Sequence, residues 1–192
     1  MINFVNWSII DMDKITLHGK TFRPFIKNEE LEGIIDDVAD RINADFAECE
    51  DVPILLCVLN GAVMFTAAVM KRLNFNVELC SIKLSSYVGT QSTGTVLMPI
   101  GLTSDVKDRR VIILEDIVDT GNTIVALKEL LFSKGAKDVK ICSMLMKPEV
   151  YAKPDKIDYV GKEIPNAFIV GYGLDYDELG RQYKDIYVID AQ

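Results

Sequence analysis

The stretch of the chain with the most evident chemistry runs from Val111 to Thr123 and reads VIILEDIVDTGNT. Two adjacent carboxylates, Glu115 and Asp116, follow an apolar run, and Asp119 opens a short segment of hydroxyl residues and a glycine. This order predicts a buried parallel strand, a loop and a helix. Free N–H groups at a helix start favour a phosphate, and the two acids suit ribose hydroxyls or a hydrated Mg²⁺. The segment therefore predicts a site for a sugar phosphate with a metal; the alternative is an ordinary turn capped by Asp119 and Thr120.

The same segment resembles the phosphoribosyl-pyrophosphate (PRPP) motif of type I phosphoribosyltransferases, and its wording EDIVDTG is closest to that of the hypoxanthine (6-oxopurine) phosphoribosyltransferases. The resemblance implies transfer of a 5-phosphoribosyl group from PRPP to hypoxanthine, with guanine as a second base. It makes Asp119 the general base at N7 of the purine. It also implies that Glu115 and Asp116 bind the 2′- and 3′-hydroxyls and, through them, one of up to two Mg²⁺ ions. The 5′-phosphate is then held by Thr120, Gly121, Asn122 and Thr123.

Two further loops resemble parts of the same family. Leu59, Asn60 and Gly61, within CVLNGAVMF, match the pyrophosphate loop, with Asn60 at a position where lysine is common. The corresponding peptide bond is often cis in the family, which places Leu59–Asn60 in that rare class; a plain Asn-Gly turn is the alternative. Ser86 and Tyr87 match the long loop that closes over the site and excludes water, for which a solvated hairpin tip is the alternative.

The purine pocket is assigned by resemblance in the second half of the chain. Lys147 follows a predicted strand and matches a lysine that donates to the purine O6, while Phe168 would stack on the base and the backbone of Ile169 would pair with its edge. Asp175 would hold a second Mg²⁺ against pyrophosphate. Arg181 would reach the pyrophosphate, a task suited to its fork of donors. The alternatives are a solvated Lys147 and a Phe168 that packs in the core.

Length and composition limit the possible partners. The chain has 192 residues, a formal net charge of −8 and 49% apolar residues, which fits one globular domain. The resemblance implies a single phosphoribosyltransferase domain over residues 1–192, with a core at about 30–148 and a hood lobe from about 1–29 and 149–192. The acidic charge argues against a nucleic-acid partner. Anionic PRPP is then neutralised locally by Mg²⁺, backbone amides and a few cations.

The cysteines and one apolar run bear on location. Four widely spaced cysteines without a C-x-x-C pair predict free thiols, and the N-terminus shows no secretion signal, so a cytoplasmic protein is expected. The uncharged run between Asp51 and Lys71 is nearly long enough to span a bilayer. Pro53 and the Asn60–Gly61 pair interrupt it, which favours a strand, a turn and a helix over a membrane segment. The cysteines are Cys49, Cys57, Cys80 and Cys142.

The elements that must position these residues follow from periodicity. Apolar runs that alternate with amphipathic stretches predict an α/β fold with a mostly parallel sheet and helices on both faces. Ligands bind such sheets outside the carboxyl ends of the strands. We expect helices at 29–48, about 62–73, and after Thr123 up to a C-cap at Gly135; strands at 54–59, 77–84, 96–100, 111–114, 139–146, 168–172 and 186–189; a loop at 85–95; and short extended pieces at 1–25.

Three other functions share some of these features. A related transferase for xanthine, uracil, orotate or adenine differs only in its base pocket. A non-catalytic PRPP-sensing regulator needs a basic nucleic-acid surface, and a PRPP synthetase-like fold needs an ATP site and a longer chain. His18 is the only histidine and is expected on the surface, so Ser-His-Asp and zinc chemistry are disfavoured. The family forms dimers and tetramers, which implies a homo-dimer or homo-tetramer.

Overall fold

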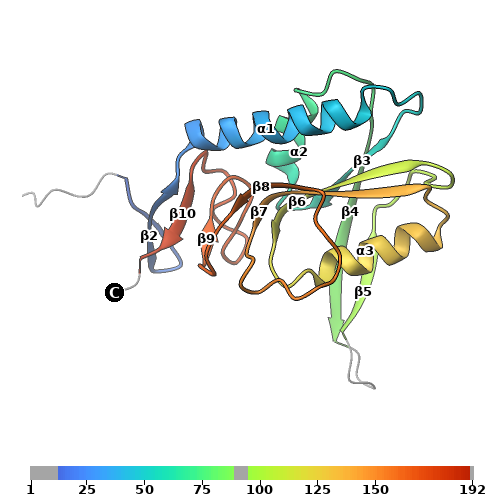
Figure 1. The fold of residues 1–192 in the computed structure, drawn as a ribbon. Helices are drawn as coiled ribbons and strands as arrows, with labels where there is room; N and C mark the ends of the chain where they lie inside the picture. Colours follow the sequence, from blue (N-terminus) through green and yellow to red (C-terminus); the bar gives the residue numbers. More distant parts are fainter. Residues whose placement is uncertain (1–12, 89–94, 191–192) are drawn as a thin grey trace, which may run out of the picture.

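A six-stranded sheet forms the centre of the molecule. The computed structural model describes the backbone of residues 13–88 and 95–190 and the side chains of residues 13–84 and 101–190. The strands lie in the order β5-β4-β3-β6-β7-β8, and all run parallel except β5, which pairs antiparallel with β4 (Figure 1). The predicted, mostly parallel sheet is therefore confirmed. Its strands are β3 (Ile54–Leu59), β4 (Glu78–Val88), β5 (Thr95–Ile100), β6 (Arg110–Val118), β7 (Asp138–Met146) and β8 (Tyr159–Glu163).

Helices cover both faces of this sheet, as predicted. Alternate residues of the central strands point to opposite faces: Leu55 and Ile112 pack with α1 (Asn28–Phe46) and α2 (Val63–Met70), whereas Leu56 and Ile113 pack with α3 (Asn122–Ser133). Figure 1 shows α1 and α3 on opposite sides of the strands. Strands that are buried on both faces explain the continuous apolar runs of the sequence.

A second, antiparallel sheet brings distant parts of the chain together. It has the order β1-β2-β10-β9 and lies at one end of the molecule, where blue and red strands meet in Figure 1. Phe22 and Val170 are fully buried in its own small core. This sheet corresponds to the expected hood. Its strands are β1 (Ile15–Leu17), β2 (Lys20–Ile26), β9 (Ile169–Val170) and β10 (Ile186–Ile189).

Several element boundaries differ from the expectation. β8 was not predicted, and it belongs to the core sheet although residues from 149 onward were expected in the hood. Its sequence YVGKE is short and largely polar because it is an edge strand that pairs only with β7. Residues 85–88 were expected in a loop but extend β4, because pairing with residues 95–98 of β5 outweighs their polar composition. Residues 89–94 lie outside the described part.

The apolar run after Asp51 is divided between elements. It forms β3, a turn and α2, as the sequence predicted, and α2 ends at Met70 rather than near residue 73. In the described ranges, no helix is both long and apolar enough to cross a bilayer. All four cysteines are free, and three of them are buried.

Candidate active site

The predicted chemical groups gather at the carboxyl edge of the parallel sheet. β3 ends directly before Asn60, β6 before Asp119, and β7 before Lys147. Glu115 and Asp116 lie within the last four residues of β6, because this strand continues past them to Val118. Neighbouring parallel strands bring these groups to one edge, where ligands of open α/β sheets bind.

The β6–α3 loop (residues 119–123) has the geometry of an anion site. Gly121 adopts a left-handed conformation, with φ of 80°, at the N-cap of α3, and no side chain caps the helix. The first turn carries no acidic residue, so no carboxylate of the helix itself neutralises the N–H groups of the helix start or the positive end of its dipole, and the nearest acids of the site are Glu115 and Asp119. A cavity of about 70 Å³ is lined by this loop together with Glu115 and Ile117. This arrangement can hold a phosphate.

The surroundings of the two β6 carboxylates, Glu115 and Asp116, disfavour their ionised form. Oε2 of Glu115 is buried and has no hydrogen-bond partner among the described residues. Burial, and then the charge of Asp116, raises the pKa of Glu115 well above its usual value. Burial also raises the pKa of Asp116 to about 6, although its Oδ1 accepts a hydrogen bond from the N–H of Ile117 at 3.0 Å. Buried acceptors without partners are rare in folded proteins, so this pair is suited to a ligand that brings hydroxyl donors or a cation.

The β3–α2 loop (residues 60–62) lies directly against Asp116. The Leu59–Asn60 peptide bond is cis, as the resemblance implied. A Cβ atom built on Gly61 would lie 1.8 Å from Oδ2 of Asp116, so only glycine fits at this position. The backbone of this loop and the Asp116 carboxylate therefore form one continuous wall.

A turn between the hood strands completes this wall. Gly173, with φ of 100°, packs on Gly61: a Cβ atom built there would lie 2.0 Å from the Gly61 carbonyl oxygen. Arg181 donates to the Gly173 carbonyl at 2.8 Å and forms an ion pair with Oδ1 of Asp175 at 2.8 Å. The charges of Arg181 and Asp175 both act on the pKa of Asp116. The structure thus brings Gly61, Asp116, Asp175 and Arg181 together from separate parts of the chain.

Asp119 and Lys147 form a pair at the other side of the site. Nζ of Lys147 lies 3.2 Å from Oδ2 of Asp119, and the backbone N–H of Lys147 donates to the Val118 carbonyl at 3.0 Å. Lys147 is 8% exposed, so the solvated alternative for this residue is wrong. The side chain of Asp119 is half exposed. A buried ammonium and an accessible carboxylate can donate to one edge of a ligand and accept from it.

Phe168 offers an aromatic face beside the hood. It is 43% exposed, and its ring contacts Tyr176 edge to face at 5.4 Å and Phe22 at a tilt at 6.1 Å. These contacts fix the ring while leaving much of its surface free. Ile169 is buried in β9 and pairs with Val188 of β10. Phe168 can therefore pack against the hood and also stack on a ligand.

The remaining expected residues have different outcomes. His18 is exposed, as predicted, and its ring contacts Tyr176. The backbone of Ser86 and Tyr87 belongs to β4, but their side chains lie outside the described part of the structure. Across the residues with described placement, no group of three or more His, Cys, Asp or Glu side chains is arranged to hold a metal ion unaided.

Sequence reasoning missed two residues that shape the site. Tyr151 packs on the β6–α3 loop. Its ring lies so close to Gly121 that a Cβ atom built on this glycine would be 2.5 Å from Cε2 of the ring. No local pattern marks Tyr151, which lies in the irregular segment after β7. Gly173 was not singled out either, although the glycines of GYG in this region are a signal for a close backbone approach.

The chain is similar to known proteins over most of its length. Residues 26–177 match the family model described as a phosphoribosyl transferase domain. The chain is 35% identical over 179 residues to the hypoxanthine-guanine phosphoribosyltransferase of Staphylococcus epidermidis, covering 92% of this chain and 98% of that protein. It is 45% identical over 141 residues to the protein of the same name from Lactococcus lactis, covering 73% and 76%. The crystal structure of a hypoxanthine-guanine phosphoribosyltransferase from Bacillus anthracis is similar with a TM-score of 0.79 and 31% identity, covering 87% of this chain and 98% of that one.

Proposed function

The chain belongs to the phosphoribosyltransferase family, and from this premise we propose that it is a purine-salvage enzyme. It transfers the 5-phosphoribosyl group of PRPP to N9 of a 6-oxopurine and releases pyrophosphate. Hypoxanthine and guanine are the proposed bases, which give IMP and GMP. The observation that carries this proposal is the meeting of an uncapped helix start with the two partly buried carboxylates of β6, of which Glu115 has a buried oxygen without a hydrogen-bond partner among the described residues. A phosphorylated ribose needs these two kinds of group side by side.

The residues present fit a role for Mg²⁺, of which one or two ions are proposed. Glu115, Asp116 and Asp175 offer carboxylate oxygens, the ligands that Mg²⁺ prefers. Mg²⁺ is usually held by one or two carboxylates together with water and substrate phosphates, so an unaided protein cage is not required. Glu115 and Asp116 would hold the ion through the ribose hydroxyls, and Asp175 would hold a second one. When bound, Mg²⁺ neutralises the charge of the departing diphosphate.

Each remaining site residue has a proposed task in the transfer. The N–H groups and hydroxyls of residues 120–123 bind the 5′-phosphate, and the β3–α2 loop with Arg181 binds the diphosphate. Phe168 stacks on the purine, while the backbone of Ile169 pairs with its edge. Lys147 donates to O6 and Asp119 accepts the proton at N7, which is consistent with their separation of 3.2 Å. Closure of the segment with Ser86 and Tyr87 would exclude water from the reacting centre.

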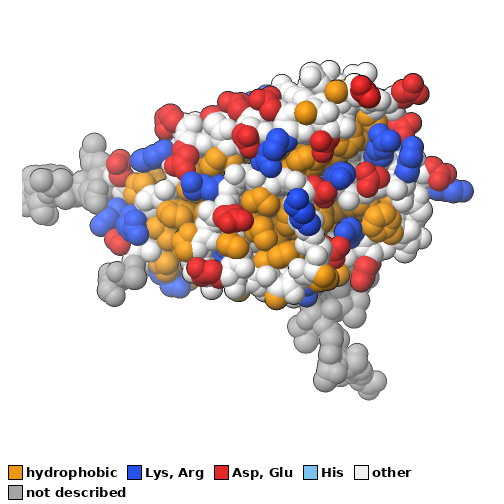
Figure 2. All heavy atoms as spheres, viewed as in Figure 1, with side chains coloured by type: hydrophobic (Ala, Val, Ile, Leu, Met, Phe, Trp, Pro, Cys, Tyr) orange, Lys and Arg blue, Asp and Glu red, His pale blue; other side chains and the backbone are white. Residues whose placement is uncertain are grey.

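A spectrophotometric assay with PRPP, Mg²⁺ and a panel of bases tests the function. We expect turnover with hypoxanthine and guanine and little with uracil, orotate or adenine. Turnover with another base instead would identify a related transferase, and PRPP binding without turnover would indicate a regulator. On the face drawn in Figure 2, Lys and Arg side chains are interspersed with Asp and Glu side chains rather than forming a continuous basic surface.

Two further features belong to the same proposal. We infer a homo-dimer or homo-tetramer from the family resemblance; the similar hypoxanthine phosphoribosyl transferase of Trypanosoma cruzi is described with a role of its C-terminal region in its oligomeric state. Light scattering tests this inference. A cytoplasmic location without membrane attachment is supported by the four free cysteines, since a reducing compartment keeps thiols unpaired.

A further inference from the structure

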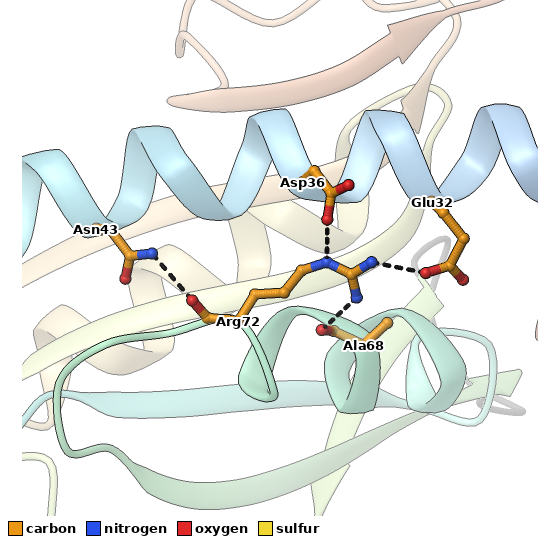
Figure 3. Close-up of polar contacts among 5 residues, drawn as sticks. All are labelled: Glu32, Asp36, Asn43, Ala68 and Arg72. Atoms are coloured by element: carbon orange, nitrogen blue, oxygen red, sulfur yellow. Dashed lines mark hydrogen bonds and ion pairs between the residues drawn. The ribbon is translucent and has the colours of Figure 1, made fainter.

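A polar network joins the end of α2 to α1. The guanidinium of Arg72, in the turn that follows α2, forms ion pairs with two acids of α1: Nε lies 2.5 Å from Oδ1 of Asp36, and Nη2 lies 2.6 Å from Oε2 of Glu32. Its third nitrogen, Nη1, donates to the Ala68 carbonyl of α2 at 3.0 Å. Figure 3 shows the guanidinium between the two helices, with every contact directed to a different partner.

A second residue of α1 holds the same turn. Nδ2 of Asn43 donates to the Arg72 carbonyl at 3.0 Å, and its Oδ1 accepts from the N–H of Asn74 at 3.0 Å. The turn after α2 is therefore fixed on α1 through both its backbone and its side chain. The Arg72 side chain is 22% exposed, whereas the side chains of Glu32 and Asp36 are 44% and 63% exposed, so the guanidinium is shielded from water more than its acidic partners are.

The side of α2 that faces away from α1 is less tightly packed. The helix is apolar around its whole circumference, and Val63 is 49% exposed. A cavity of about 310 Å³ lies along this side, between α2 and the strands β3 and β4, and is lined by Val63, Met70 and Leu79 among others. Because a cavity lies on this side, packing there restrains α2 only weakly. The position of the helix therefore depends more strongly on the polar contacts at its end.

The start of α2 adjoins the proposed pyrophosphate site, where the backbone of Gly61 is closely packed against its neighbours. Val63 begins the helix two residues after Gly61, and eight helical residues span only ~12 Å, so a displacement at Arg72 is transmitted along a rigid element. Gly61 has no room to move toward Asp116 or Gly173, given the 1.8 Å and 2.0 Å separations that added Cβ atoms would have. A shift of α2 would change the position of the loop backbone relative to both.

The network also faces the hood side of the same site. The pKa of Tyr172 is raised by its burial and by the Glu32 carboxylate and lowered by the Arg72 guanidinium, so these charges lie near this tyrosine. Tyr172 precedes Gly173, whose carbonyl accepts the hydrogen bond from Arg181. The charges of the Arg72 network therefore act on the residue that precedes Gly173.

We propose that Arg72 is a positioning residue for pyrophosphate binding: by joining the end of α2 to α1, it holds Gly61 in place against Asp116 and Gly173. This inference rests on the proposed function. It concerns the diphosphate end of PRPP and free pyrophosphate, and not the purine base, because Lys147 follows β7 and Phe168 precedes β9, whereas Tyr172 and Gly173 follow β9. Arg72 touches neither ligand.

The test compares R72M with R41M in the complete enzyme. Arg41 is a matched control, because it also pairs with an acid of α1, Asp37 at 2.9 Å, and donates to a carbonyl, that of Val160 in β8 at 2.8 Å. We expect R72M to raise the KM for PRPP, and the KM for pyrophosphate in the reverse reaction, by about 3- to 30-fold. The KM for hypoxanthine and kcat at saturating PRPP should stay within about twofold, and R41M should change none of these values by more than about twofold.

Three outcomes overturn the inference. Unchanged KM values for PRPP and pyrophosphate in R72M would show that Arg72 does not position the site. An equal rise of these KM values in R72M and R41M, or an equal rise in the KM for the base, would show that Arg72 contributes only to the general stability of the fold. Should R72M fail to fold, R72K is measured instead: the three donors of an ammonium lie on one atom and cannot span the acceptors that Nε, Nη1 and Nη2 of Arg72 reach separately, so the same two KM values should rise to a smaller extent. An inactive wild-type enzyme would overturn the proposed function itself, whereas an active wild type with an unchanged R72K or R72M overturns this inference alone.

Discussion

The 5′-phosphate side and the pyrophosphate side of the site are built in different ways. The first is one contiguous segment, the β6–α3 loop, whose anion-binding groups are the backbone of a helix start. The second is assembled from three distant parts: the β3–α2 loop, Asp116, and the hood turn with Asp175 and Arg181. A contiguous site depends on local geometry, whereas an assembled site depends on how closely separate elements approach. The two sides should therefore fail differently when they are mutated.

The largest effect is expected on the contiguous side, at Asp119. D119N keeps the shape of the loop but removes the proton acceptor, so kcat should fall about 10²- to 10⁴-fold while PRPP affinity is retained. Steady-state kinetics and calorimetric PRPP titration measure the two quantities separately. Loss of PRPP binding together with kcat would mean that Asp119 is needed for the loop structure, and the proposed role as a base would be wrong.

The assembled side should be most sensitive at Gly61. G61A places a methyl group against Oδ2 of Asp116, where 1.8 Å is available, so the loop must move away and kcat/KM for PRPP should fall about 100-fold. Gly33 is the matched control, because a Cβ atom there in α1 meets nothing within 4 Å. G33A should leave the kinetics unchanged and stabilise the fold by about 0.5–1 kcal/mol. Equal activity of the two variants would contradict the close approach.

These two sides also differ in what the sequence revealed. The apolar run, the acids and the turn residues of 111–123 are neighbours in the chain, so the strand, loop and helix were predictable, and β3 and β10 have the predicted bounds. The approach of Gly173 to Gly61 and of Tyr151 to Gly121 depends on packing between distant segments, which local patterns do not encode. β8 was missed for the same reason, since its pairing with β7 rather than its own composition makes it a strand.

A smaller effect is expected at the aromatic face that stacks on the base. F168A should raise the KM for hypoxanthine about 5- to 100-fold, the range that loss of one base-stacking contact of about 1–3 kcal/mol implies. The KM for PRPP should not change. Phe132 on α3, which is 47% exposed, provides the control, and F132A should affect neither KM. A rise in the KM for PRPP in F168A would show that the ring supports the assembled side instead.

The smallest effect concerns stability without ligand. The folded-state pKa of Asp116 is about 6, above the usual value of 3.8, so the folded protein holds the proton more tightly and its stability falls as pH rises from about 4 to about 6. D116N removes this dependence and should stabilise the ligand-free protein by about 1–3 kcal/mol at pH 8, with little change at pH 4. Urea unfolding at the two pH values measures the difference. A variant that is less stable at pH 8 would contradict the cost assigned to this buried charge.

The most direct test of the central claim is calorimetric titration of PRPP into the wild type and into the double variant E115Q/D116N, each with and without Mg²⁺. The wild type should bind PRPP with Mg²⁺ and bind it much more weakly without the metal, while the double variant should lose most of the affinity and the metal dependence. The same affinity in both proteins, or no binding to the wild type in magnesium buffer, would contradict the assignment of these carboxylates and of the sugar-phosphate site.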